Sequence, residues 1–304
     1  MRLLKEKYEG LHEFGNLPKE LKDILLEPDI QKALARSDLE YIYNKYKLLS
    51  GKITQLLNSL NIDPLNYLSY IPDRFLANTT IKHIDIPDHI THIDDSAFFQ
   101  CEELTNITIP DNVVSIAHAA FYGCTGLTGV VIGSSVADID IQAFYGCTSL
   151  ADITIPNSVT NIGDYAFSHC SGLASITIPG SVTTIGYSAF SECNSLRSIT
   201  TLDGVISIGK YAFSGCEKLE SAAIGNSVTN IDDCAFADCA KLTRVIIPNS
   251  VTHIGEFAFY NCNKLHDIRY AGTISQWSKI HFGDKWNKDS AIKTIHCADG
   301  DVKL

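Results

Sequence analysis

Apolar residues recur along this chain with a fixed period of 23 residues. The clearest marker is an Ala-Phe pair with a Cys three positions after the Phe, as in Ala166, Phe167 and Cys170. The Phe of the pair recurs without insertion at Phe98, Phe121, Phe144, Phe167, Phe190, Phe213, Phe236 and Phe259. A unit of this length cannot bury its apolar side alone, so the pattern predicts a solenoid of stacked rungs.

Each rung is predicted to contain two short extended segments and one helical turn. Residues 173–178 alternate between apolar and polar types, which is typical of a half-buried strand. Residues 181–186 form a second, shorter extended segment. Ala189, Phe190 and Cys193 then have the spacing of three inward-facing side chains on one helical turn.

A glycine recurs after the second extended segment and predicts a corner with a left-handed backbone. It is present as Gly163, Gly186, Gly209 and Gly255. Aspartate or alanine holds the same position in other rungs, so the requirement for glycine is not strict.

Residues 1–70 have a helical pattern without the repeat. The predicted helices cover residues 18–27, 30–36 and 39–60, with a further short helix from Pro64. Ser37 and Glu40 have the spacing of a capping box, and Gly51 is predicted to bend or break the long helix.

A degenerate first rung is predicted to join these helices to the array. Phe75 lies 23 residues before Phe98, which predicts that it starts the Phe column. Arg74 would then replace the Ala, and Asn78 would replace the Cys.

The C-terminal tail is predicted to cap the last rung. Both tryptophans, Trp277 and Trp286, lie in it, and Phe282 continues the 23-residue register from Phe259. The predicted organisation is a helical cap or docking domain over residues 1–72, a solenoid of one degenerate and eight regular rungs over 73–270, and a C-terminal cap over 271–304.

The repeated pattern L-x-x-I-x-I-P-x-S-V-T-x-I-G-x-x-A-F-x-x-C, over residues 75–270, resembles the BspA-type leucine-rich repeat. Residues 270–277 and 295–300 are similar to the tail that often ends such arrays. The resemblance implies an α/β repeat: a curved, right-handed leucine-rich-repeat solenoid with a parallel β-sheet on its concave side, here preceded by a small all-helical domain. It also implies protein recognition, often in bacterial cell-surface adhesion, although phage and protist proteins carry the repeat as well.

Charge separates the two halves of the array. The chain has a net charge of −11, and between residues 81 and 196 Lys82 is the only basic residue against 12 acidic ones. Such a surface repels phosphate groups, which excludes nucleic acid and anionic membranes as partners and favours a basic protein or a cation. No apolar run is long enough to cross a bilayer, so membrane insertion is not expected.

Location is predicted from the first residues and from cysteine usage. Residues 1–14 carry charges where a secretory signal needs an apolar segment. Ten cysteines without such a signal fit a reducing compartment. The expected location is therefore the cytoplasm or a virion, with the cell surface reached only by a non-classical route.

Catalytic and metal-binding motifs are missing from the sequence. The chain has no G-x-S-x-G, H-E-x-x-H, G-x-G-x-x-G or P-loop pattern, and no Cys-x-x-Cys. Eight cysteines lie in register within the repeat and are predicted to be buried free thiols that fill the core. We therefore expect no enzyme, no cofactor and no metal, against a weak alternative of a metal site among the histidines and aspartates of residues 83–95.

Two candidate binding surfaces remain. Phe99, Tyr122 and Tyr145 follow the buried Phe in three successive rungs and are predicted to stack about 5 Å apart as an amphipathic strip. The outward-facing strand positions are small and polar, and Arg244 and Arg269 are the only arginines on them.

The function expected from these patterns is a non-enzymatic scaffold that binds a protein partner, of the adhesion or recognition type. One alternative is a structural component of a phage virion or cell envelope that docks or forms a homo-oligomer through residues 1–72. A metal-binding protein or an enzyme is the weaker alternative.

Overall fold

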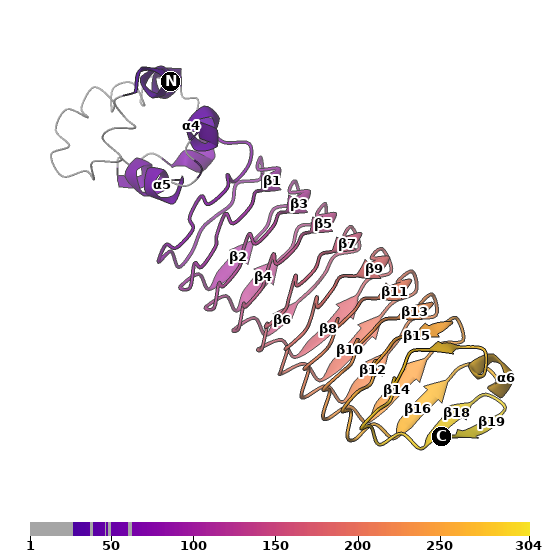
Figure 1. The fold of residues 1–304 in the computed structure, drawn as a ribbon. Coiled ribbons are helices and arrows are strands. Elements are labelled where there is room, and N and C mark those ends of the chain that lie inside the picture. Colours follow the sequence, from indigo (N-terminus) through magenta and orange to yellow (C-terminus); the bar gives the residue numbers. More distant parts are fainter. Residues whose placement is uncertain (1–26, 37–38, 46, 48–49, 60–62) are drawn as a thin grey trace.

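The structure is a computed structural model that describes residues 27–36, 39–45, 47, 50–59 and 63–304. Three helices, α3 (Pro28–Arg36), α4 (Leu39–Lys45) and α5 (Ser50–Ser59), and the short helix η3 (Pro64–Asn66) gather at one end of a long solenoid (Figure 1). The helix predicted over residues 18–27 lies almost wholly outside the described residues, and so does Ser37 of the predicted capping box.

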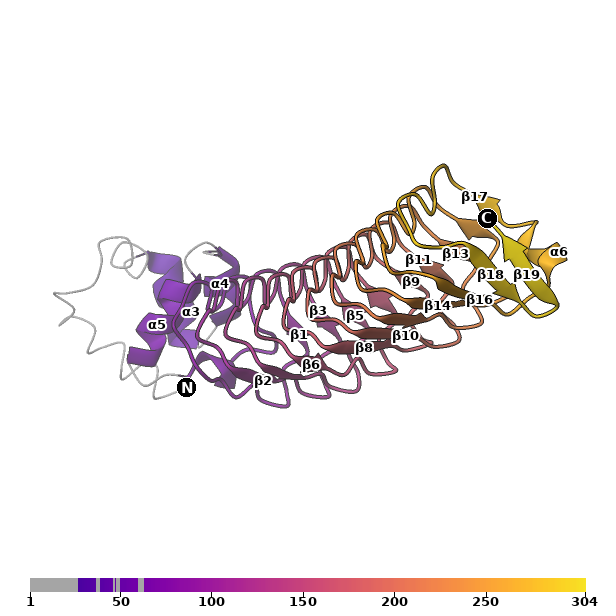
Figure 2. The same cartoon turned by 90° about the horizontal axis from the view of Figure 1, so that it is seen from below.

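The solenoid is built from two sheets that run along its length, and their strands are parallel except for the last one, residues 300–303, which pairs antiparallel with its neighbour (Figure 2). The first sheet contains β2 (Asn106–Thr108), β4 (Gly129–Val131), β6 (Asp152–Ile153), β8 (Ser175–Ile178), β10 (Ser198–Thr201), β12 (Ser221–Ala223), β14 (Arg244–Ile247), β16 (Asp267–Tyr270), β18 (Thr294–Cys297) and β19 (Gly300–Lys303). The second sheet contains β1 (His92–Ile93), β3 (Ser115–Ile116), β5 (Asp138–Ile139), β7 (Asn161–Ile162), β9 (Thr184–Ile185), β11 (Ser207–Ile208), β13 (Asn230–Ile231), β15 (His253–Ile254) and β17 (His281–Phe282).

Strand register follows the 23-residue period directly. Ser198 pairs with Ser175 on one side and with Ser221 on the other, so each side chain lies beside the residue 23 positions away. A backbone hydrogen bond of 3.1 Å from Ala174 to Ala151 continues the first sheet between β6 and β8. The predicted solenoid with parallel sheets is thus confirmed, including the alternation of buried and exposed residues in β8.

The third side of each rung is made of turns, and the predicted helical turn is wrong. Ser188 and Glu192 have left-handed backbones, with φ of 50° and 58°. Between them the N–H of Phe190 donates to Ala212 of the next rung at 2.8 Å, while the N–H of Ser191 donates within its own rung. Because of the two left-handed residues, every second N–H group in this segment donates to the next rung. In a helix, all of these N–H groups would donate within their own rung.

Glycine recurs after the second extended segment for a different physical reason from the one predicted. The left-handed residues precede and follow the Ala-Phe pair, and Gly163 has no positive φ. A Cβ atom on Gly163 would lie 2.6 Å from the backbone nitrogen of Ile141 in the preceding rung. Close approach of two rungs, and not backbone conformation, therefore favours glycine at this position.

The core consists of columns of identical residues. The column rings Phe98 to Phe259 are fully buried and stack with centroids between 4.9 Å and 5.4 Å apart. The eight in-register cysteines are also fully buried, as predicted, and Cys170 donates its S–H to the carbonyl oxygen of Phe144 at 3.1 Å. All ten cysteines are free thiols in the structure.

The first rung corrects the predicted register by one residue. Leu76 donates its N–H to Ala97 at 2.8 Å, as Phe98 does to Ala120 at 2.7 Å, so Leu76 starts the Phe column. Phe75 takes the place of the Ala and packs against Tyr43 of α4, with ring centroids 5.7 Å apart. Leu76 lies 22 residues before Phe98, so this rung is one residue shorter than the regular ones.

Two further predictions change with this register. Arg74 and Asn78 occupy the two left-handed positions, with φ of 55° and 59°, and do not replace the Ala and Cys. Thr79 takes the place of the Cys, and its hydroxyl donates to Leu76 at 2.7 Å. The helix predicted over residues 39–60 is divided into α4 and α5. Gly51 lies just after the division, in the first turn of α5, where a Cβ would lie 3.3 Å from the carbonyl oxygen of Ala77.

The C-terminal tail also departs from the predicted register. Phe282 pairs with Ile254, 28 residues earlier, and so does not continue the Phe column. The insertion that lengthens this rung contains α6 (Ile274–Trp277), which begins with a capping box formed by Thr273 and Gln276. Trp286 packs edge-on against Phe259, with centroids 6.1 Å apart, and covers the end of the column.

Candidate partner-binding surfaces

The aromatic strip, defined as Phe99, Tyr122 and Tyr145, lies on the turn side of three successive rungs. The rings of Phe99 and Tyr122 stack with centroids 5.0 Å apart and planes 13° apart. Tyr122 and Tyr145 stack at 4.7 Å and 7°. The structure therefore brings these three residues together as predicted, each half-buried, with the ring faces covering one another.

The strip ends against an imidazole and carries no charge of its own. His169 packs edge-on against Tyr145, with centroids 5.2 Å apart. Burial, with a smaller contribution from Tyr122, raises the pKa of Tyr145, so its hydroxyl stays protonated. The available parts of the strip are ring edges and neutral hydroxyl groups, which suit contact with another protein.

Carboxylates of the acidic half accept hydrogen bonds from backbone N–H groups of the following rung. Asp111 accepts a hydrogen bond from the backbone N–H of Ser134 at 2.7 Å, and this bond lowers the pKa of Asp111. Asp164 accepts the N–H of Tyr187 in the same way. Within residues 81–196, all of which are described, the ion pair to a lysine or arginine is that of Lys82 with Glu103, at 3.5 Å.

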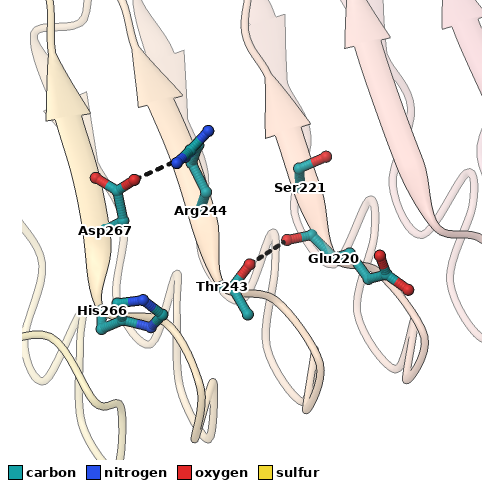
Figure 3. A pocket seen from close by; sticks show the side chains of 6 residues that line it. All are labelled: Glu220, Ser221, Thr243, Arg244, His266 and Asp267. Carbon is teal, nitrogen blue, oxygen red and sulfur yellow. Dashed lines mark hydrogen bonds and ion pairs between the residues drawn. The ribbon is translucent and has the colours of Figure 1, made fainter.

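The two arginines of the first sheet share one carboxylate. Arg244 donates from Nε to Asp267 at 2.6 Å (Figure 3), and Arg269 donates from Nε to the same carboxylate at 3.1 Å. The side chain of Asp267 is 14% exposed. Burial alone would raise the pKa of Asp267, but the hydrogen bonds from both guanidinium groups outweigh it and hold the pKa below its usual value.

Open pockets lie on both sides of this cluster. One, of about 330 Å³, is lined by Glu220, Ser221, Thr243, Arg244, His266 and Asp267 (Figure 3). The other, of about 430 Å³, is lined by Arg269, Tyr270, Ala271, His296, Cys297 and Ala298. Both are shallow depressions in the polar surface of β12 to β18, so neither encloses a small ligand.

Sequence reasoning missed two features of these surfaces. The pairing of Arg244 with Asp267 follows from the 23-residue register and could have been found from it. A second line of tyrosines, Tyr165, Tyr187 and Tyr211, crosses the rungs after the strip with centroids 5.2 Å and 5.5 Å apart. These residues alternate between two neighbouring positions of the repeat, which hides them from a search at a fixed position.

Metal ligands do not converge in the part of the chain that the structure describes. Among those residues, no group of three or more His, Cys, Asp or Glu side chains is placed to hold an ion. His83 of the first rungs instead lies 2.9 Å from Asp85 as an exposed pair. No helix among the described residues is long and apolar enough to cross a membrane.

A model of the BspA-type leucine-rich repeat region, in six copies, matches residues 69–197 and 160–288. This chain belongs to that family. The match confirms the resemblance drawn from the repeat pattern. The BspA-type repeat thus accounts for most of the chain, and repeats of this kind serve as scaffolds for protein interactions. No protein of curated function matches the chain.

Solved structures of bacterial leucine-rich repeat proteins are similar to this BspA-type chain. One from Bacteroides ovatus is 30% identical, with a TM-score of 0.54, over 72% of this chain and 62% of that protein. The chain thus spans less than two thirds of that relative. A leucine-rich repeat protein of T. pallidum is 32% identical over 53% of this chain and 75% of its own, with a TM-score of 0.45. A leucine-rich cell surface protein of Faecalibacterium prausnitzii is 34% identical over 65% and 68%, with a TM-score of 0.35.

Proposed function

We propose that this chain is a non-catalytic scaffold that binds a protein partner through the acidic N-terminal half of its solenoid. The observation that carries the proposal is the aromatic strip: three half-buried rings stacked at 5.0 Å and 4.7 Å within residues 81–196, a stretch that holds 12 acidic residues and one basic residue. Large rings are efficient anchors in protein interfaces, because they offer much contact area at little cost in side-chain entropy.

The charge of the half that holds the strip favours a basic partner. Asp111 accepts the backbone N–H of Ser134, which lowers the pKa of its carboxyl and keeps it ionised, and no lysine or arginine pairs with it in the described structure. A field of one sign accelerates encounter with a protein of the opposite sign, and added salt weakens that effect. We therefore expect an association rate that falls as the ionic strength rises.

The test uses the full chain to capture a partner, and then measures the affinity of the purified pair by calorimetry. The variant is F99S/Y122S/Y145S, since later rungs carry Ser168 and Ser191 at the same position of the repeat. Loss of about 2–4 kcal/mol of binding free energy, roughly 30- to 1000-fold in Kd, is expected from removal of three anchors.

A matched control removes the same number of rings from the other tyrosine line. The variant Y165S/Y187S/Y211S is expected to bind the partner as wild type does, because these rings lie outside the strip. Serine fits the left-handed backbone of Tyr165 and Tyr211, since Ser96 and Ser188 have the same conformation in other rungs. Equal binding by wild type and the strip variant would show that the strip only covers the join between rungs.

A further inference from the structure

The C-terminal end of the first sheet carries a compact arginine patch, defined as Arg244, Ile246, Asp267 and Arg269. Arg244 lies beside Asp267 on the neighbouring strand, and Ile246 lies beside Arg269. The two arginines thus occupy opposite corners of a square on β14 and β16, with the carboxylate and the apolar side chain at the other corners. Asp267 binds both guanidinium groups and fixes their positions.

The guanidinium groups keep most of their donors. Each uses Nε to bind Asp267, and no other side-chain hydrogen bond of Arg244 or Arg269 is present in the described part of the chain. The Nη groups of both side chains, which are 51% and 59% exposed, remain available to an acceptor. Two positive charges face one negative charge here, so the patch has an excess of one positive charge.

Neighbouring groups do not cancel this excess. Glu220 of the adjacent pocket is engaged with Arg197 at 2.9 Å, and His296 is engaged with Asp301 at 2.8 Å. The patch is therefore a local positive site on a chain whose net charge is −11.

Ile246 supplies an apolar surface between the arginines. Its side chain is 44% exposed and lies beside Ala223 on one side and Arg269 on the other. An exposed β-branched residue next to charged side chains is a surface that another apolar side chain can cover. Arginine beside an apolar contact is the composition of interface hot spots.

We propose that the arginine patch binds an acidic peptide segment of a partner protein, in which a Glu or Asp carboxylate lies next to an apolar side chain. The carboxylate accepts hydrogen bonds from the Nη groups of Arg244 and Arg269, a geometry for which the planar guanidinium fork is suited. The adjacent apolar side chain packs on Ile246. The site is independent of the proposed binding at the aromatic strip, and either can fail without the other.

The patch fits a single carboxylate better than a phosphate or a sulfate chain. Asp267 lies between the two arginines, so a multiply charged anion meets repulsion as well as attraction. The apolar contact at Ile246 has no counterpart in a sulfated sugar. A peptide satisfies the charge and the apolar surface together.

The test follows the Ile and Val methyl groups of the full chain by NMR during titration with a capped peptide, acetyl-Leu-Glu-Leu-amide. A saturable shift of the Ile246 methyl signals is expected at millimolar peptide, and acetyl-Leu-Gln-Leu-amide should bind at least about tenfold more weakly, because charge-assisted hydrogen bonds are the stronger ones. Val131, 61% exposed at the equivalent position beside Thr108, has no arginine beside it, and its signals should not move.

Lysine variants separate geometry from charge. R244K and R269K keep the positive charge but lose the fork, so each should reduce binding of the Glu peptide by about tenfold. R197K is the matched control: Arg197 is paired with Glu220 of the next rung, outside the patch, so this substitution should leave binding unchanged. Thermal melting of each variant shows whether the fold is retained.

Three results would overturn the proposal. The first is equal binding of the Glu and Gln peptides at Ile246. The second is wild-type affinity in both R244K and R269K. The third is displacement of the peptide by a sulfated heparin disaccharide at lower concentration than the peptide itself requires, which would make the patch a polyanion site.

Discussion

The two halves of the solenoid share one interior and have different surfaces. The Phe and Cys columns run through both halves without a break, and every column ring and thiol is fully buried. On the surface, residues 81–196 carry 12 acidic residues and one basic residue, whereas residues 197–270 carry seven basic and eight acidic ones. Aromatic rings stack in the first half, and ion pairs join the rungs of the second.

The difference shows how a strict repeat encodes a surface. Each exposed side chain lies beside the residues 23 positions before and after it. The chemistry of the surface therefore depends on which residues occupy the same repeat position in neighbouring rungs. Aromatic residues at the same position of neighbouring rungs stack and form the strip, as Tyr122 and Tyr145 do. Opposite charges at one position give an inter-rung ion pair, as in Lys210 and Asp233 at 3.0 Å. The interior constrains neither choice.

The first prediction tests whether the interior is the same in both halves. Cys124 of the first half and Cys216 of the second are fully buried, and burial raises the pKa of both thiols, that of Cys216 to about 12. Alkylation then requires an opening of the fold, so both should react at least about 1000-fold more slowly than Cys297, which is only half-buried. Mass spectrometry after timed iodoacetamide labelling at pH 8 measures the alkylation rate of each cysteine. Faster labelling of Cys124 than of Cys216, or the reverse, would show that the interior opens more readily in that half.

Removal of a column ring is expected to cost the same in either half. Phe121 and Phe213 are both fully buried and stack on rings at both faces. F121A and F213A should each lower the free energy of unfolding by about 3–5 kcal/mol, as expected for a buried Phe. Denaturant unfolding measures this, with T177A on the exposed face of β8 as a control expected to change stability by less than about 0.5 kcal/mol. A difference above about 2 kcal/mol between the Phe variants would separate the two interiors.

The strip variant F99S/Y122S/Y145S should cost less than one column ring. Its rings are half-buried, and two stacked pairs contribute about 0.5–1.5 kcal/mol each, for a total of about 1–3 kcal/mol. Denaturant unfolding of this variant beside Y165S/Y187S/Y211S compares three stacked rings with three tilted ones. A loss larger than that of F121A would place the strip in the core and remove it as a surface for partners.

Much of the fold could be predicted because every rung obeys one spacing. The strands, the buried columns and the stacked strip all follow from the 23-residue register. The register failed where an apolar residue fell in the expected place by coincidence: Phe75 comes one residue before the true column position, and Phe282 follows an insertion. Sequence spacing cannot detect such shifts, since a large apolar residue at either position satisfies the pattern.

The turn side and the arginine patch were harder to predict. The spacing of Ala189, Phe190 and Cys193 suits a helical turn and a series of tight turns equally, and residues other than glycine have the left-handed backbone at most of these positions. For the patch, the sequence placed Arg244 and Arg269 on one face. Only the structure shows that Asp267 binds both through Nε and leaves the other donors exposed.

The smallest expected effect separates the ion-paired half from the acidic half by pH. In the folded state the pKa of Asp267 lies below its unfolded value of about 3.9, because two arginines bind the carboxylate. A depressed pKa stabilises the fold at pH values above the unfolded pKa, and this contribution is lost as the pH falls through the folded pKa. D267N should therefore lower stability by about 0.5–1 kcal/mol at neutral pH. The difference in unfolding free energy between D267N and wild type should stay constant down to about pH 5 and disappear below about pH 4.

Asp152 occupies the same repeat position in the first half, beside Gly129 and with no arginine, so D152N should change stability by less than about 0.5 kcal/mol. Urea unfolding of the three proteins at several pH values measures both, and equal losses in D152N and D267N would show that the ion pairs do not distinguish the halves.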